Sequence, residues 1–278
     1  MHIYPSRLIL RRCLQPYESY VEIFQTDLPN EEKVSKVVNK KSLWGIFMEL
    51  INQIFAKENV NSGRQMEIDL AKVVFVLMVA AVHITIDCVP EEALSTGLPY
   101  VFDSVIGGPM IAPGLMFAMG ACLVYSRRQG WKDIFHRGIF IFILGFVLNL
   151  CRYTIPDLIG YAISGDAERY LDPILYQTFN NDIFQFAGLA LMTIALFLKL
   201  KLKDGVMIAI ALLCSVVGTL LNGVDVGSVP GNMILGYFVG VEDAAGKVLS
   251  YFVYLNWLIM PVSGYVFGKL LKRMKDKD

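Results

Sequence analysis

The sequence predicts an all-α fold, a polytopic membrane helix bundle of about six transmembrane helices with both termini in the cytoplasm. Three observations support this. Hydrophobic residues make up 55% of the chain, charged residues make up 18%, and the mean hydropathy is +0.52. Soluble domains carry about 25% charged residues, so this composition is typical of a multi-pass membrane protein. The other two observations are long apolar runs and basic residues placed unevenly between them.

The apolar runs approach the about 20 residues that an α-helix needs to cross a bilayer. Six of them recur along the chain, with approximate bounds 67–88, 103–125, 134–151, 183–200, 205–223 and 248–270. An even number of crossings brings both termini to the same side of the membrane.

Basic residues decide which side that is. The connections on one side of the predicted bundle, together with the tail, carry Arg127, Arg128, Lys132, Arg137, Lys199, Lys201, Lys203, Lys269, Lys272, Arg273, Lys275 and Lys277. The other side carries only Arg152, Arg169 and Lys247. Together with the nine Lys and Arg of residues 1–66, this asymmetry predicts cytoplasmic termini.

Two domains follow from this pattern, a cytoplasmic head over 1–63 and a transmembrane domain over 64–278. The head holds a mixed stretch from Arg7 to Gln25, a charged linker from Asp27 to Lys41, and an amphipathic helix near 42–57. Apolar residues recur in that helix at helical spacing, namely Trp44, Phe47, Ile51, Ile54 and Phe55. The helix either lies in the membrane interface or packs within the protein.

Four ionisable side chains share one side of the first apolar run: Asp69, Lys72, His83 and Asp87. At about 100° per residue, Asp87 projects in the direction of Asp69, whereas Lys72 and His83 lie about 60° and 40° away. Ionisable groups inside a membrane are costly and usually mark a substrate or ion path. This line of polar residues is therefore the first candidate for a functional site.

His83 is the candidate catalytic residue of that line, because a neutral imidazole can act as a general base or a nucleophile. Asp87 follows one turn later and could accept a hydrogen bond that fixes the tautomer of the ring. The alternative is a histidine that bonds a carbonyl of a neighbouring helix and takes no part in catalysis.

The second run contains small residues every four positions, at Gly114, Ala118, Cys122 and Ser126. This spacing predicts close packing against another helix. Pro109 and Pro113 remove two amide donors, which frees carbonyls and should bend the outer half of the helix. The opened turn is either a packing feature or the lining of a cavity opposite His83.

Polar residues also mark the third and fourth runs. Arg137 and Arg152 flank the third and could both be interfacial anchors. Alternatively, Arg137 binds an anionic cofactor group from the cytoplasm, while Asn149 and Arg152 stand near the level of His83. Asn149 lies inside the apolar core of this run and is harder to explain as an anchor. At the start of the fourth run, Asp182 is explained by an N-cap, or together with Gln185 by a polar outer vestibule.

Other features exclude several classes of function. The net charge is zero, with 25 basic and 25 acidic residues, which gives no indication of nucleic-acid binding. The cysteines form no CxxC pair and no metal-ligand spacing, so no metal is expected.

Two outward connections are long, 152–182 and 224–247, and are expected to be loops that could carry binding. The second is expected to be a surface turn or a re-entrant element.

These stretches resemble the integral-membrane acyltransferases, and most of all the branch related to heparan-alpha-glucosaminide N-acetyltransferase. The family's first catalytic helix reads arginine, a hydrophobe, aspartate, arginine and histidine, and the matching residues here are Arg64, Ile68, Asp69, Lys72 and His83. The stretch from Pro113 to Gly120 and the stretch from Asp182 to Ala190 are similar to two further motifs. The resemblance covers about residues 64 to 271.

The resemblance implies an enzyme of the cell membrane, an acyltransferase that moves an acetyl group from cytoplasmic acetyl-CoA to an amine or hydroxyl of an extracytoplasmic sugar or glycan. His83 would be catalytic, with Asp87 as its orienter. The donor would be held by Asp69, Lys72, Arg127, Arg128 and Arg137. The acceptor side would be shaped by Asn149, Arg152, Asp182 and Gln185.

Members of this family usually have more helices, so either a homo-oligomer or a missing C-terminal half would complete the bundle. Two other functions compete with acyl transfer. The polar line could serve as a relay in a transporter of small solutes or protons. The chain could also be a non-catalytic membrane subunit.

Overall fold

The computed structural model describes residues 43–241 and 251–275. The chain separates into two compact units, residues 1–57 and 58–278. In the first unit, helix α3 (Leu43–Ile54) occupies the stretch predicted to be amphipathic and exposes Phe47 and Ile54. The predicted stretches from Arg7 to Gln25 and from Asp27 to Lys41 lie outside the described residues.

The second unit is built from helices, and no β-strand occurs in residues 43–241 and 251–275. Four helical segments are long and apolar enough to cross a membrane: Met66–Cys88, Gly97–Tyr125, Trp131–Ser164 and Ala167–Lys199. A shorter apolar helix, α12 (Asp204–Leu220), follows them. The structure thus confirms a helical membrane protein.

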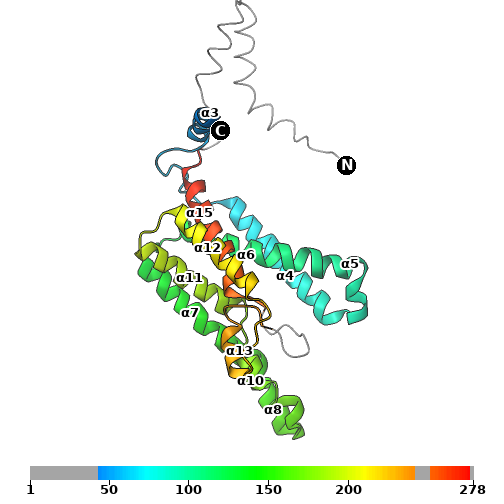
Figure 1. Ribbon diagram of the computed structural model, residues 1–278. Helices are drawn as coiled ribbons and strands as arrows, with labels where there is room; N and C mark the ends of the chain where they lie inside the picture. Colours follow the sequence, from blue (N-terminus) through cyan, green and yellow to red (C-terminus); the bar gives the residue numbers. More distant parts are fainter. Residues whose placement is uncertain (1–42, 242–250, 276–278) are drawn as a thin grey trace, which may run out of the picture. The chain divides into compact units, whose positions relative to one another are not determined.

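The first two segments form an antiparallel pair (Figure 1). Helix α4 (Met66–Cys88) is followed by a 3-10 turn, η1 (Glu91–Ser95). The second segment then runs through α5 (Gly97–Tyr100), a π-helix η2 (Val101–Ile111) and α6 (Ala112–Tyr125), and α4 packs against η2 and α6. The π-helix contains Pro109, whose missing N–H cannot support regular α-helical bonding. The stretch that leads to Pro109 therefore departs from regular α-helical bonding, and the bend predicted from the prolines stays a prediction.

The third segment continues past the point where the sequence placed its end. Helix α7 (Trp131–Asn149) runs through a π-turn, η3 (Leu150–Thr154), into α8 (Ile155–Ser164) without a break. The prediction that this run stops near Arg152 was wrong. Pro156 directly follows this π-turn, where regular α-helical bonding is already interrupted, and the proline does not end the helix.

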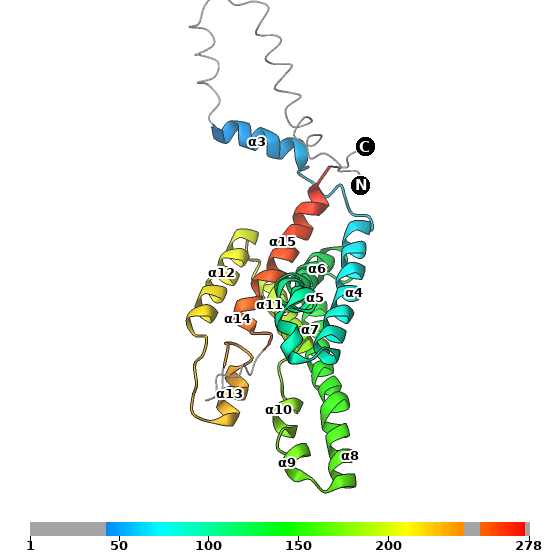
Figure 2. The same ribbon diagram turned by 90° about the vertical axis from the view of Figure 1, so that its right-hand side faces the viewer.

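The predicted outer loop over 152–182 is likewise mostly helical. After α8 the chain turns at Gly165, which has a φ of 70° that favours glycine, and returns through α9 (Ala167–Tyr170) and α10 (Ile174–Thr178). Figure 2 shows this return beside α8. Helix α11 (Ile183–Lys199) then starts at the residue predicted for the fourth run.

Helices α7 and α11 pack closely against each other through glycines. A Cβ atom placed on Gly188 would lie 2.7 Å from the carbonyl oxygen of Gly138 and 2.7 Å from the backbone nitrogen of Phe142. Small residues let helix backbones approach in this way. Buried Phe186, Leu191 and Ile194 of α11 add the apolar core.

Three further helices complete the second unit in the described residues. Helix α13 (Val229–Leu235) is a short segment of the second outer connection, whose residues 242–247 lie outside the described part. The predicted last run, 248–270, begins later than expected in the described residues, with α14 (Tyr254–Trp257) and α15 (Ile259–Arg273).

Helix α15 packs on α6 at very short range. A Cβ on Gly264 would lie 1.9 Å from the carbonyl oxygen of Phe117, and one on Gly120 would lie 2.0 Å from that of Pro261. The predicted small-residue stripe faces α4 and not α15, since Gly114 lies against the ring of Phe75 on α4. The closest approach therefore uses a different face of α6 from the one that the spacing indicated.

Candidate functional site

The first turns of α4 hold an ion-pair cluster centred on Asp69. Its carboxylate accepts from Arg64 Nε at 2.6 Å and pairs with Lys72 Nζ at 2.7 Å, one turn along the helix. Lys72 also interacts with the side chain of Cys122 on α6. The cluster therefore links the start of α4 to the end of α6.

Three arginines lie next to that junction. Ser126 follows Cys122 by one helical turn, and its hydroxyl accepts a hydrogen bond from Arg137 Nη2 at 3.2 Å. Arg127 and Arg128 are exposed in the turn that joins α6 to α7. The five residues predicted to hold the donor thus gather at one end of the bundle. Exposed guanidinium groups here can form charge-assisted hydrogen bonds to phosphate.

A cavity of about 760 Å³ opens between α4, α6 and α15. Its wall is mainly apolar and includes Phe75, Gly114, Phe117 and Phe267, with Asn61 and Gln65 at one end. These two amides bond each other, Gln65 Nε2 to Asn61 Oδ1 at 2.7 Å. A cavity of this size and lining is typical of small-molecule sites.

His83 and Asp87 lie on another side of α4. Counted from Phe75, which faces the cavity, His83 is rotated by about 80° and Asp87 by about 120°. Both side chains are exposed. In the part of the chain that the structure describes, no hydrogen bond joins the two residues. The residues predicted as base and orienter therefore share a side of α4, but the structure does not connect them.

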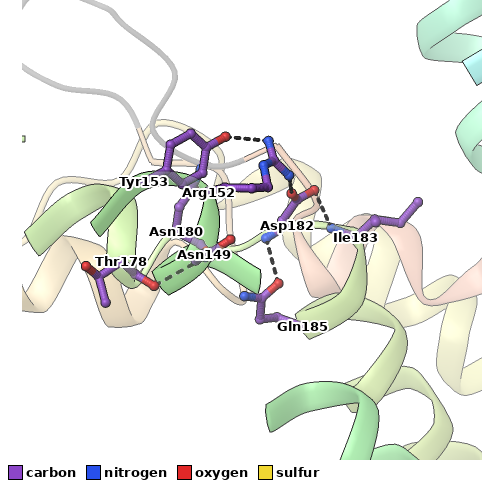
Figure 3. A network of polar contacts seen from close by, with 8 residues as sticks. All are labelled: Asn149, Arg152, Tyr153, Thr178, Asn180, Asp182, Ile183 and Gln185. Atoms are coloured by element: carbon purple, nitrogen blue, oxygen red, sulfur yellow. Dashed lines mark hydrogen bonds and ion pairs between the residues drawn. The ribbon is translucent and has the colours of Figure 1, made fainter. Parts of the chain in front are cut away.

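The four residues predicted for the acceptor side come together where α7 ends and α11 begins (Figure 3). Asn149 is 2% exposed, and its Nδ2 donates to the carbonyl oxygens of Thr178 at 3.2 Å and Asn180 at 3.0 Å. Arg152 Nη1 lies 3.1 Å from Asp182 Oδ2. One polar network therefore ties the α7–η3 junction to the start of α11.

Asp182 and Gln185 also form the N-terminal capping box of α11. Asp182 Oδ1 accepts from Ile183 N at 2.7 Å, and Gln185 Oε1 accepts from Asp182 N at 3.2 Å (Figure 3). The N-cap predicted for Asp182 is confirmed, and the partner Arg152 joins the same carboxylate. Gly145 leaves room for the Gln185 amide, because a Cβ there would lie 2.5 Å from Gln185 Cδ.

Polar atoms without a partner are concentrated around this network. Gln185 Nε2, Asn180 Oδ1 and Asn181 Oδ1 are buried and make no hydrogen bond within the described residues. Asn181 is 3% exposed and donates to the carbonyl of Phe252 at 2.7 Å. Sequence reasoning did not assign Asn180 and Asn181 a role, although their place directly before the N-cap was a usable signal.

Metal ligands give no comparable cluster. Among the residues that the structure describes, no three His, Cys, Asp or Glu side chains lie together in a way that could hold a metal ion. The polar groups that converge are the cations at one end and the amides at the other.

Comparison with known proteins identifies the family. Residues 64–278 match the family described as heparan-alpha-glucosaminide N-acetyltransferase, catalytic. No curated protein and no solved structure matches the chain. The matched region contains the ion-pair cluster, the arginine turn, His83 and the amide network. The chain belongs to the heparan-alpha-glucosaminide N-acetyltransferase catalytic family and is a membrane acyltransferase.

Proposed function

We propose that the protein moves an acetyl group from cytoplasmic acetyl-CoA to an amine or hydroxyl of a sugar or glycan on the outer side of the cell membrane. The chain would cross the membrane six times, with both termini in the cytoplasm. Membership of the acetyltransferase family supports the reaction class. Donor, acceptor and orientation are the further steps of the proposal.

The separation of two polar groups toward opposite ends of the bundle carries this proposal. Cationic side chains gather where α4 begins and α6 ends, whereas the buried amides lie where α7 ends and α11 begins. At 1.5 Å per residue, His83 lies about 21 Å along α4 from Asp69, and Asn149 lies about 18 Å along α7 from Arg137. The candidate base and the amide network therefore lie at similar depths, away from the cations.

Each end suits one substrate. Arg127, Arg128 and Arg137 would bind the phosphates of the donor, and the Asp69–Lys72 pair would border the entrance. Hydroxyl and amine groups of a sugar can both donate and accept hydrogen bonds, which matches the mixed donors and acceptors around Asn149 and Gln185. His83 would act on the acceptor proton as a base, or would carry the acetyl group transiently.

Transfer of label tests the role of His83. Membranes containing the wild-type chain should transfer label from radiolabelled acetyl-CoA to membrane glycans, and His83→Ala should lose at least about 100-fold of this activity. His136→Ala is the matched control, because His136 is exposed on the first turns of α7. Label retained by the protein without acceptor would indicate the carrier route. Full transfer by His83→Ala would contradict the proposed mechanism.

Binding tests the donor end independently of turnover. Arg137→Ala should weaken acetyl-CoA binding to membranes by about tenfold, the effect of one lost charge-assisted hydrogen bond. Lys203→Ala removes a charge from the turn between α11 and α12 and should leave binding unchanged. Equal binding by wild type and Arg137→Ala would remove Arg137 from the donor site. Wild-type membranes that bind no acetyl-CoA would contradict the donor itself.

A further inference from the structure

A second cavity, of about 190 Å³, lies beside the end of α15. Three separate parts of the chain form its wall: the segment before α4, the turn between α6 and α7, and the last turns of α15. Its polar lining consists of Asn59, Gln129, Tyr265, Lys269, Lys272 and Arg273. None of these residues belongs to the donor or acceptor groups described above.

Backbone contacts hold this cavity in shape. The carbonyl oxygen of Lys272 accepts from Val60 N at 3.0 Å and from Asn61 N at 2.9 Å, which fixes the segment before α4 across the end of α15. On the opposite wall, Gln129 Nε2 donates to the carbonyls of Val124 at 2.7 Å and Ser126 at 2.8 Å. The recess is therefore built by interactions between distant parts of the chain.

The cavity carries an excess of positive charge. Lys269 is paired with Asp204, and Lys272 Nζ lies 5.4 Å from the centre of the Tyr125 ring. Within residues 43–241 and 251–275, no ion pair joins Lys272 or Arg273 to an acidic side chain. The helix dipole favours cations at the end of α15, but it does not account for a recess that they line.

We propose that this cavity binds a phosphate group. Lysine and arginine form charge-assisted hydrogen bonds to phosphate oxygens, and a guanidinium can bind two of them at once. A volume of 190 Å³ is below the about 300–1,000 Å³ of sites for whole small molecules, so the cavity suits one phosphate group of a larger ligand.

Two ligands could supply that group. One is the 3′-phosphate of the coenzyme A donor, an assignment that rests on the proposed function; the neighbouring turn carries Arg127 and Arg128. The other is the phosphate of an anionic lipid headgroup, since basic recesses between membrane helices bind such headgroups on the cytoplasmic side.

The test uses the full chain with the double substitution Lys272→Gln and Arg273→Gln. Lys269 is left in place because its loss would strand Asp204. A second double variant, Lys201→Gln with Lys203→Gln, removes the same amount of positive charge from the turn between α11 and α12, which does not line the cavity. Wild type and both variants are compared for binding of coenzyme A and 3′-dephospho-coenzyme A in neutral detergent, and for thermal stabilisation by phosphatidylglycerol in phosphatidylcholine nanodiscs.

If the donor supplies the phosphate, the cavity variant binds coenzyme A at least about tenfold more weakly than wild type and binds the dephospho form equally well. An equal loss for both forms assigns the cavity to the donor's diphosphate. If lipid supplies the phosphate, the variant loses the stabilisation by phosphatidylglycerol and keeps its affinity for coenzyme A.

Behaviour identical to the Lys201 and Lys203 control in every measurement would overturn the phosphate site. Wild-type protein that binds no coenzyme A would count against the proposed function, whereas the lipid comparison would still decide the role of the cavity. The two failures are therefore distinguishable.

Discussion

Asn149 shows how one polar side chain can hold two segments of a membrane helix bundle together. It is 2% exposed inside an apolar helix, and its single amide nitrogen donates to two carbonyls of the segment before α11. A buried polar group costs free energy unless it is hydrogen-bonded. The Asn149 amide therefore favours the arrangement in which the two carbonyls lie next to the end of α7. An interfacial anchor would not be buried in this way.

Asn149→Asp should destabilise the protein. The substitution preserves the shape of the side chain but replaces both N–H donors with an oxygen that faces the carbonyls of Thr178 and Asn180. We expect a loss of about 2 kcal/mol or more in the free energy of unfolding, measured as a lower Tm in detergent. Asn222→Asp, at an exposed position, should leave the free energy of unfolding within about 0.5 kcal/mol of wild type, and so the Tm nearly unchanged. An unchanged Tm for Asn149→Asp would contradict the burial of the amide.

The residues of the amide network also show what local sequence can and cannot reveal. The N-cap at Asp182 follows from an acidic residue directly before an apolar run, and the capping box confirms it. The ion pair with Arg152 joins residues 30 positions apart. That contact depends on the packing of α7 against α11, which no local pattern specifies.

At the scale of elements, the α7–α11 pair combines a close backbone crossing with buried apolar side chains of α11. Its helices meet backbone to backbone at Gly138 and Gly188, where no side chain fits. This contact positions the amide network, because Asn149 ends α7 and Asp182 caps α11. The geometry of the amide network therefore depends on the two glycines.

Gly188→Ala should separate the two helices. The new methyl group would lie 2.7 Å from backbone atoms of α7, and a backbone cannot rotate away as a side chain can. We expect a destabilisation of about 1–3 kcal/mol, read from the Tm in detergent. Gly205→Ala adds a methyl group in α12 with nothing within 4 Å and should be neutral or slightly stabilising. Equal Tm values for both variants would argue against the close crossing.

The connection after α12 is held by side-chain contacts within itself and by one to the segment before α11. Asp225 Oδ1 accepts from Asn232 Nδ2 at 2.7 Å and from Gly227 N at 2.7 Å, and these bonds lower the pKa of the Asp225 carboxyl. Tyr237 donates its hydroxyl hydrogen to the carbonyl of Phe179 at 2.6 Å, which joins the connection to the segment before α11.

Tyr237 should make stability depend on alkaline pH. Burial raises the pKa of Tyr237 to about 12, against about 10 in an unfolded chain. Because the folded pKa is the higher one, the neutral hydroxyl contributes fully below about pH 10, and its contribution is lost as the pH rises through about 12. Tyr237→Phe should lower the Tm at neutral pH by the equivalent of about 1 kcal/mol, through loss of the bond to Phe179.

The Tm of the wild type should therefore converge on that of Tyr237→Phe between about pH 10 and 12. Tyr251→Phe serves as the control, because Tyr251 is 62% exposed; it should follow the wild type throughout. Parallel curves for wild type and Tyr237→Phe up to pH 12 would exclude the titration of Tyr237 as the cause.

At the scale of the whole molecule, composition and apolar runs were sufficient to predict a helical membrane protein, and the start of α11 was placed at the correct residue. The continuation of α7 into α8 was missed. Arg152 and Pro156 signal an end in a regular helix, whereas the π-turn Leu150–Thr154 carries the chain past both. The sequence also predicted that the residues proposed to bind the donor share one end of the bundle, but not the contacts that join them, since these contacts depend on which faces of α4 and α6 meet.

The crossing number and orientation can be tested with reporter fusions in a bacterial host. Alkaline phosphatase needs disulfides and is active only outside the cytoplasm, whereas green fluorescent protein is fluorescent inside it. Positive charges at the ends of α6, α11 and α15 should keep these ends in the cytoplasm. Fusions after Lys203 and after Asp278 should therefore fluoresce and lack phosphatase activity, and a fusion after Asp225 should give the opposite result. Phosphatase activity at Asp278 would mean an odd number of crossings between Lys203 and the C-terminus. That outcome would leave the cations of α15 on the outer side, where a cytoplasmic donor could not reach them.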